Sequence, residues 1–148
     1  MTEEKKYTES KNTPATKPMN KIRVLLVDDE TAYVDVLANR LGKRGFDVKK
    51  AYTSPEALLV LRTQQFDVAV LDLKMPDMDG IEVLKIAKQV DPTLQVIMLT
   101  GHGSAAACDQ GLALGAFDYL MKPCEFDTLV DKIQEAFQKK SFPSPSST

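Results

Sequence analysis

Cysteine and histidine are scarce in this chain of 148 residues, which contains two cysteines, one histidine and no tryptophan. Cys108 and Cys124 are too few for a disulfide framework, and one imidazole is too few for a typical zinc site. No apolar run approaches the roughly 20 residues that a membrane-spanning helix needs. The charges nearly balance, with 19 Lys and Arg against 21 Asp and Glu, which argues against a general basic surface for nucleic acid or anionic lipid. We therefore expect a cytoplasmic protein without membrane contact and without direct nucleic-acid binding.

The two ends of the chain differ from its middle. Residues 1–20 are almost entirely polar, without a helical or strand period, and residues 141–148 are rich in serine and proline. Such segments bury too little apolar surface to offset the entropy that is lost on ordering. The polar opening also lacks the apolar stretch of a secretory signal peptide. We expect a flexible tail at 1–20, one globular domain at 21–140, and a flexible tail or linker stump at 141–148.

Short apolar segments alternate with amphipathic ones through the middle of the chain. The predicted strands are residues 24–27, 47–52, 68–71, 96–99 and 117–121. Helical spacing predicts a helix after each strand, with Val36 in the core stripe of the first helix and Leu59 in that of the second. Short strands that are apolar on both faces are typical of a parallel sheet with helices on both sides. The pattern predicts a doubly wound α/β fold with five strands and five helices.

Three of the predicted helices begin with capping signals. Ser54 followed by Pro55 is typical of an N-cap and a first helical residue, and Asp79 with Glu82 fits a variant of the capping box. Ser104 is in position to cap the fourth helix. A side-chain oxygen at each of these positions satisfies a backbone N–H that the first turn leaves unpaired.

Polar side chains stand where the predicted strands end. Asp28 and Asp29 follow the first strand, Asp72 the third, Thr100 the fourth and Lys122 the fifth. Because the carboxyl ends of parallel strands meet at one edge of a sheet, we expect these side chains to lie close together. Carboxylates in mutual reach raise one another's pKa unless a cation lies among them, and hard oxygen ligands suit Mg²⁺. The edge is therefore either a metal and phosphoryl site, with an aspartate as nucleophile, or a surface cluster of acids.

Four sequence strings carry a resemblance to a known family. The chain contains VLLVDDE, VLDLKMPDMDG, VIMLTGHG and GAFDYLMKP in that order, each at the end of a predicted strand. Together they resemble the receiver domain of two-component response regulators, and the similarity covers about residues 22–139. The resemblance implies a flavodoxin-like three-layer sandwich whose five parallel strands have the order 2-1-3-4-5.

The resemblance implies a role for each acid at the sheet edge. Asp72 is expected to be the phospho-acceptor, which attacks the phosphoryl group of a phosphohistidine on a histidine kinase or phosphotransfer protein. Asp29, Asp72 and the backbone carbonyl of Lys74 are expected to bind Mg²⁺ directly, and Asp28 through a water. Lys122 is expected to pair with the acceptor carboxylate and then with the phosphoryl oxygens.

The resemblance also implies a conformational switch. The bond between Lys122 and Pro123 is expected to be cis, which directs the lysine into the site. Thr100 is expected to bond a phosphoryl oxygen, and Tyr119 to turn inward after it. The change is expected to reach a face formed by the fourth helix, the fifth strand and the fifth helix. An unknown downstream protein, or a second copy of the chain in a phosphorylation-dependent dimer, would bind there.

We expect a signalling switch that assists its own phosphorylation and dephosphorylation, rather than a metabolic enzyme. A small Mg²⁺-dependent aspartyl phosphatase is the alternative that the same residues allow. His102 and Lys74 are either positions that tune the lifetime of the phosphate or solvated loop residues. The chain is either a stand-alone regulator or the receiver part of a longer one.

Overall fold

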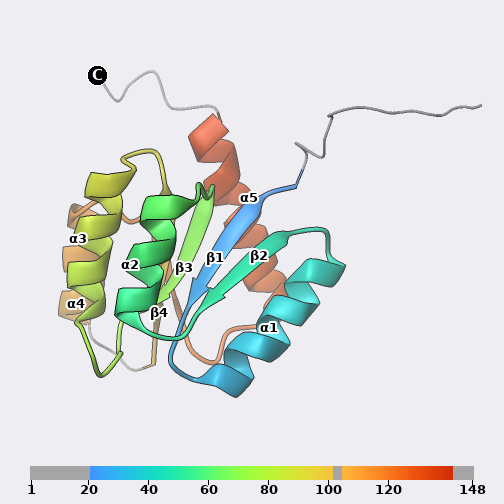
Figure 1. Ribbon diagram of the computed structural model, residues 1–148, viewed down its shortest axis with the longest axis horizontal. Helices are drawn as coiled ribbons and strands as arrows, with labels where there is room; N and C mark the ends of the chain where they lie inside the picture. Colours follow the sequence, from blue (N-terminus) through green and yellow to red (C-terminus); the bar gives the residue numbers. More distant parts are fainter. Residues whose placement is uncertain (1–20, 102–104, 142–148) are drawn as a thin grey trace, which may run out of the picture.

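Five strands and five helices alternate along the residues that the computed structural model describes, 21–101 and 105–141 (Figure 1). The predicted tail at 1–20 and residues 142–148 lie outside the described residues. The elements are β1 (Arg23–Val27), α1 (Thr31–Lys43), β2 (Asp47–Ala51), α2 (Ser54–Thr63), β3 (Val68–Asp72), α3 (Gly80–Val90), β4 (Gln95–Thr100), α4 (Ala105–Ala113), β5 (Asp118–Met121) and α5 (Phe126–Ser141). None of the described helices is both long and apolar enough to cross a membrane.

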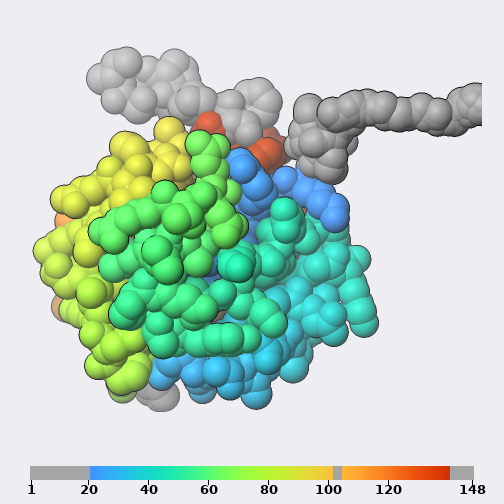
Figure 2. Space-filling view, viewed as in Figure 1, coloured from blue at the N-terminus to red at the C-terminus, as the bar shows by residue number. Residues whose placement is uncertain are grey.

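The sheet is parallel throughout, with the strand order β2-β1-β3-β4-β5. This confirms the predicted doubly wound α/β fold and the strand order that the resemblance implied. Helices α2, α3 and α4 lie on one face of the sheet, and α1 and α5 lie on the other (Figure 1). Figure 2 shows the outer surface of α2 and α3, which pack against each other. The carboxyl ends of the strands therefore meet at one edge between two helical layers.

Alternation along the central strands builds a core on both sides of the sheet. In β1, Leu25 and Val27 belong to the core under α2 and α3, whereas Val24 and Leu26 belong to the core under α1 and α5. Strands β3 and β4 are buried on both faces in the same way. The edge strands β2 and β5 are only partly buried. The prediction of strands that are apolar on both faces therefore holds for the three central strands alone.

Two apolar residues that the spacing places in the core are exposed instead. Val36 in α1 is 60% exposed, and Leu59 in α2 is 62% exposed. The positions of α1 that face the core are Val34, Leu37 and Leu41, which are three and four residues apart. Val36 lies about 100° around the helix from Leu37 and so points away from the sheet. The prediction that Val36 belongs to the core-facing stripe of α1 was therefore wrong.

The cap of α2 differs from the prediction by one residue. Thr53 is the N-cap, and its side-chain oxygen accepts a hydrogen bond from the first turn of the helix. Ser54 is instead the first residue of the helix, because its hydroxyl donates to Asp77 Oδ1 at 3.0 Å. Asp79 caps α3 as predicted. Ser104 lies outside the described residues.

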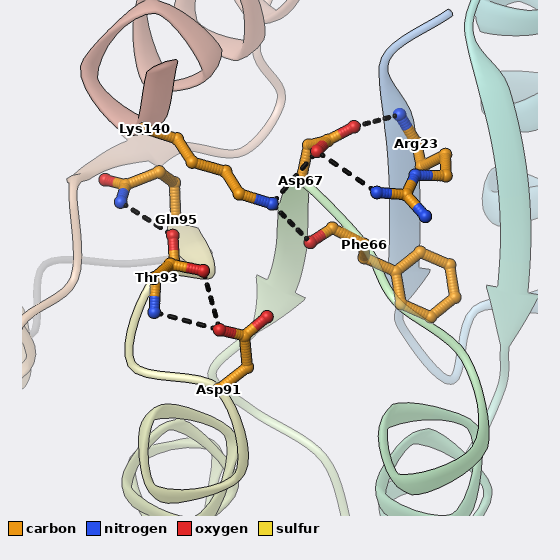
Figure 3. Close-up of polar contacts among 7 residues, drawn as sticks. All are labelled: Arg23, Phe66, Asp67, Asp91, Thr93, Gln95 and Lys140. Carbon is orange, nitrogen blue, oxygen red and sulfur yellow. Dashed lines mark hydrogen bonds and ion pairs between the residues drawn. The ribbon is translucent and has the colours of Figure 1, made fainter. Parts of the chain in front are cut away.

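A polar cluster closes the opposite, amino-terminal edge of the sheet (Figure 3). The Asp67 carboxylate accepts hydrogen bonds from Arg23 N and from Lys140 Nζ, each at 2.9 Å. Lys140 also donates to Phe66 O at 3.2 Å. Burial alone would raise the pKa of Asp67, but the Arg23 N–H and the Lys140 ammonium outweigh it and lower the pKa. The cluster fastens the last turn of α5 to the starts of β1 and β3.

Candidate functional site

Three aspartates meet at the carboxyl edge of the sheet. Asp28 and Asp29 directly follow β1, and Asp72 is the last residue of β3, which pairs with β1 in parallel. One carboxylate oxygen of each aspartate lies within 4.8 Å of the other two. Asp28 and Asp72 are 3% and 4% exposed, whereas Asp29 is exposed. The predicted cluster therefore forms, with two buried members and one that opens to solvent.

Backbone N–H groups hold one oxygen of each buried carboxylate. Asp28 Oδ1 accepts a hydrogen bond from Glu30 N at 2.9 Å, and Asp72 Oδ1 accepts one from Lys74 N at 3.1 Å. Each bond comes from the residue two positions further along, as in an Asx-turn. The second oxygens, Asp28 Oδ2 and Asp72 Oδ2, lie 2.8 and 3.6 Å from Lys122 Nζ. The local backbone thus orients both carboxylates toward the lysine.

Asp28 Oδ2 is a buried atom whose partner among the described residues is the Lys122 ammonium, 2.8 Å away. That distance is that of an ion pair, and the Asp28 carboxylate is one of the groups that raise the pKa of Lys122. A carboxylate oxygen can accept more than one contact, so a bound cation, or a water bound to that cation, would add a second partner to this buried atom. With Asp29 and Asp72 beside it, the site offers the hard oxygen ligands that Mg²⁺ prefers. The residues present therefore fit a divalent cation.

Lys122 supplies the positive charge that the sequence predicts at this edge. Its ammonium lies 2.6 Å from Glu30 Oε1 and 5.0 Å from the centre of the Tyr33 ring. Its bond to Pro123 is cis, as the resemblance implied. Burial disfavours the charged form, but the carboxylates of Asp28 and Glu30 outweigh burial and raise the pKa of Lys122. Lys122 is therefore a fixed cation.

The pKa of the Asp72 carboxyl is raised to about 6. Loss of solvation on burial is the main cause, and the negative charge of Asp28 adds to it. The Lys74 N–H and the Lys122 ammonium act in the opposite direction without cancelling the rise. The repulsion that the sequence predicts among these carboxylates is therefore present. At neutral pH Asp72 is still mostly ionised, which is the state that a nucleophile requires.

An open cavity of about 910 Å³ lies over these groups. Its walls include Asp29, Asp72 and Lys122, together with Lys74 and Pro76 from the loop after β3. Residues at the ends of three strands therefore face one space that is open to solvent. The Asp72 carboxylate therefore lines a cavity that a solute can enter.

The loop after β3 is shaped by close backbone packing and by one link to α2. A Cβ on Gly80 would lie 2.6 Å from Leu73 Cα, so a larger residue requires the backbone to move. The Asp77 carboxylate accepts hydrogen bonds from Ser54 N at 3.2 Å and from Ser54 Oγ at 3.0 Å. The loop that would present the metal-binding carbonyl is thus held at both its end and its middle.

The predicted switch residues lie further along the sheet. Thr100, the last residue of β4, is 5% exposed, and its carbonyl accepts the Lys122 N–H at 2.7 Å. Tyr119 lies on the edge strand β5, is 39% exposed and does not line the cavity. Lys74 is exposed and lines the cavity, whereas His102 lies outside the described residues. The structure brings the acids, Lys74 and Lys122 together but leaves Tyr119 apart from them.

Two residues without a predicted role, Glu30 and Tyr33, contact the Lys122 ammonium. The sequence signal for Glu30 is its charge directly after two site acids. Tyr33 follows three residues later and so lies on the same side of α1. Asp77, also without a predicted role, binds Ser54 across the two loops. These contacts join segments that are far apart in sequence, so the spacing of residues along one helix or strand does not predict them.

The chain matches the family model of the response regulator receiver domain over residues 24–134. It is 35% identical over 116 residues to the transcriptional regulatory protein ZraR of Salmonella typhimurium, which covers 78% of this chain and 26% of ZraR. It is 37% identical over 118 residues to the DNA-binding transcriptional regulator NtrC of Proteus hauseri, which covers 80% of this chain and 25% of NtrC. The chain thus spans about a quarter of the length of these relatives.

Solved structures share the fold. A CheY-like receiver domain protein from Methanospirillum hungatei JF-1 superposes with a TM-score of 0.81 at 35% identity, covering 84% of this chain and 99% of that one. A receiver domain protein from Clostridium thermocellum gives a TM-score of 0.78 at 31% identity, covering 83% and 99%. These similarities agree with the strand order of the sheet. The chain belongs to the response regulator receiver domain family.

Proposed function

We propose that the protein is a phosphorylation-dependent signalling switch in which Asp72 accepts a phosphoryl group. One observation carries the proposal: the Asp72 carboxylate lines an open cavity with Oδ1 held by the Lys74 N–H and Oδ2 beside the Lys122 ammonium. The donor is a phosphohistidine on a histidine kinase or phosphotransfer protein, the class of partner with which receiver domains interact. The protein therefore acts on itself, not on a separate metabolic substrate.

The transfer needs little beyond placement and charge. An oxygen of the ionised Asp72 carboxylate attacks phosphorus, and an O–P bond forms while the N–P bond of the phosphohistidine breaks. The electron pair of the broken bond stays on the ring nitrogen, so the ring leaves as neutral imidazole when its other nitrogen carries a proton. The Lys122 ammonium lies 3.6 Å from Asp72 Oδ2, so it can pair with the new phosphoryl oxygens.

Asp29, Asp72 and the Lys74 carbonyl are proposed to hold Mg²⁺, with Asp28 bound through a water. Bound Mg²⁺ offsets the like charges of the carboxylates and the arriving phosphoryl group. Two observations support this assignment: one carboxylate oxygen from each of the three aspartates lies within 4.8 Å of the other two, and the pKa of Asp72 is raised in part by the negative charge of Asp28, which a cation would offset.

Incubation with Mg²⁺ and either acetyl phosphate or phosphoramidate tests the proposal, since phosphoramidate has the P–N bond of a phosphohistidine. We expect an adduct of one phosphoryl group by intact-mass measurement, and we expect base to remove it, as it removes an acyl phosphate. Steady release of inorganic phosphate without an adduct would instead support a small Mg²⁺-dependent aspartyl phosphatase. If the protein formed no adduct and released no phosphate, both functions would be contradicted.

Phosphorylation is proposed to act through Thr100 and Tyr119. Thr100 ends β4, which pairs with β3, the strand that ends in Asp72. Its hydroxyl can donate to a phosphoryl oxygen, and its inward movement would make room for Tyr119 on β5. The face of α4, β5 and α5 carries exposed Leu112 and Met121. A downstream protein, or a second copy of the chain, is proposed to bind this face after the change.

Thr100→Ala is expected to accept phosphate at Asp72 yet to show a smaller conformational response. One hydrogen bond contributes about 0.5–1.5 kcal/mol, so its loss changes the population of the switched state about 2–13-fold. Amide NMR shifts of α4 and β5, recorded with and without the phosphoryl mimic beryllofluoride, measure the response. Thr100→Ser keeps the hydroxyl and serves as the matched control, with shifts close to wild type. Equal shifts in the Ala variant and wild type would remove Thr100 from the switch.

A further inference from the structure

Three carboxylates compete for the single Lys122 ammonium. The nitrogen lies 2.6 Å from Glu30 Oε1, 2.8 Å from Asp28 Oδ2 and 3.6 Å from Asp72 Oδ2. The ammonium donates a hydrogen bond to Glu30 and forms an ion pair with Asp28. The lysine is therefore held more closely by Glu30 than by the proposed phospho-acceptor.

The backbone of Glu30 is held by hydrogen bonds, but its side chain does not cap helix α1. Glu30 is the N-cap of α1, its N–H donates to Asp28 Oδ1 and its carbonyl accepts the Val34 N–H. A side chain at this position normally accepts a backbone N–H of the first turn. The Glu30 side chain makes no such bond and reaches Lys122, 92 residues further along the chain. The Glu30 carboxylate therefore contacts Lys122 in the site instead of capping the helix.

The Glu30 side chain is 63% exposed, while that of Lys122 is 16% exposed. Water can therefore replace the lysine at Glu30 with little loss of solvation, which is not true of the buried Asp28. Of the ion pairs that Lys122 makes with Glu30 and Asp28, the one with Glu30 is therefore the easier to break. A phosphoryl group on Asp72 brings new anionic oxygens within reach of the same ammonium, which has three N–H donors.

We propose that Glu30 is a positioning residue, which holds Lys122 in the unphosphorylated protein and must release it when Asp72 is phosphorylated. This deepens the function proposed above and rests on it. In the phosphorylation by acetyl phosphate, an Asp72 oxygen bonds to phosphorus and acetate leaves with the electron pair of the broken O–P bond. Lys122 turns from Glu30 toward the phosphoryl oxygens as this occurs. Glu30 thereby sets how strongly the site favours the unphosphorylated state.

Two variants separate contact from charge. Glu30→Gln removes the charge, while Glu30→Asp keeps it on a side chain that is one methylene shorter and no longer spans the distance to Lys122. Glu82→Gln makes the same charge change on α3, where the Glu82 carboxylate pairs with Lys85, 3.2 Å away, and it serves as the control. The full chain is labelled with ¹⁵N-lysine, and the Lys122 ammonium signal is recorded without Mg²⁺. Each protein is then titrated with beryllofluoride in the presence of Mg²⁺.

We expect both Glu30 variants to shift the Lys122 signal and to bind beryllofluoride about two- to fivefold more tightly, the range set by one exposed ion pair. Glu82→Gln is expected to match wild type in both measurements. If Glu30→Gln bound beryllofluoride more tightly and Glu30→Asp bound it as wild type does, only the negative charge at residue 30 would matter. That result would overturn the positioning role. If wild type bound beryllofluoride and both Glu30 variants bound it equally well, the role of Glu30 would be overturned, but the proposed function would stand. A wild-type protein that binds no beryllofluoride would overturn the proposed function as well.

Discussion

Asp72→Asn is expected to abolish the phosphoryl adduct completely. Asn has nearly the same shape, and its amide oxygen can still accept the Lys74 N–H, but it has no anionic oxygen to attack phosphorus. Intact-mass measurement after treatment with acetyl phosphate and Mg²⁺ should show one adduct in wild type and none in the variant. An adduct that persists in the variant and resists base would place the phosphate elsewhere, for example on a serine of residues 141–148.

The same variant is expected to be more stable than wild type at neutral pH, so that unfolding does not explain the lost adduct. The pKa of Asp72 is about 6 in the folded protein, above its ordinary value of 3.8, so the folded state binds the proton more tightly than the unfolded state. Wild type therefore loses stability as the pH rises through this interval. The shift corresponds to about 3 kcal/mol at most, and we expect a gain of about 1–2 kcal/mol because Lys122 loses a partner.

Thermal unfolding at several pH values measures this effect. The difference in melting temperature between Asp72→Asn and wild type should grow as the pH rises from about 4 to about 6, and then level off. A difference that shrinks with rising pH would show that the Asp72 carboxylate is stabilised by folding, contrary to its burial beside Asp28.

Asp29→Ala is expected to weaken Mg²⁺ binding at least about tenfold and to remove Mg²⁺-dependent phosphorylation with it. Asp29 is exposed, so its truncation removes a ligand without opening the core. Tyrosine fluorescence can follow the titration, since the chain has no tryptophan and Tyr33 lines the cavity. Asp127→Ala removes another exposed carboxylate, the partner of Arg44 on the far end of α1, and should bind Mg²⁺ as wild type does. Equal affinity in Asp29→Ala and wild type would contradict the metal assignment.

The Mg²⁺ affinity of wild type should also fall as the pH drops below about 6. In that range Asp72 takes up a proton, and the proton competes with the cation for the carboxylate. Below the pKa the affinity is expected to decrease about tenfold for each pH unit, as a single competing proton requires. The same titration repeated between about pH 5 and 8 measures this dependence, and an affinity independent of pH would remove Asp72 from the ligand set.

Local pattern was sufficient to predict the fold and the membership of the acid cluster. The apolar strands and the helical stripes between them predict a parallel α/β sheet, and the polar residues at the strand ends follow from it. Asp28, Asp29, Asp72 and Lys122 lie together because parallel strands end at one edge, a rule that needs no knowledge of side-chain contacts. The strand order and the cis bond before Pro123 came from the resemblance and not from the pattern.

Contacts between distant segments were decided by the tertiary structure alone. Ser54 and its neighbour Thr53 both carry a hydroxyl that can cap α2, and the choice depends on Asp77 in another loop. Val36 fits a helical stripe as well as Val34 does, and only the placement of α1 on the sheet selects between them.

Glu30 shows the same limit within the site itself. Its sequence neighbours indicate a helix start, yet its carboxylate binds Lys122 at the other end of the domain's chain. Sequence spacing describes neighbours along one element, through the periods of the helix and the strand. The partner of a long charged side chain is set instead by which elements the fold brings within a few ångströms of it.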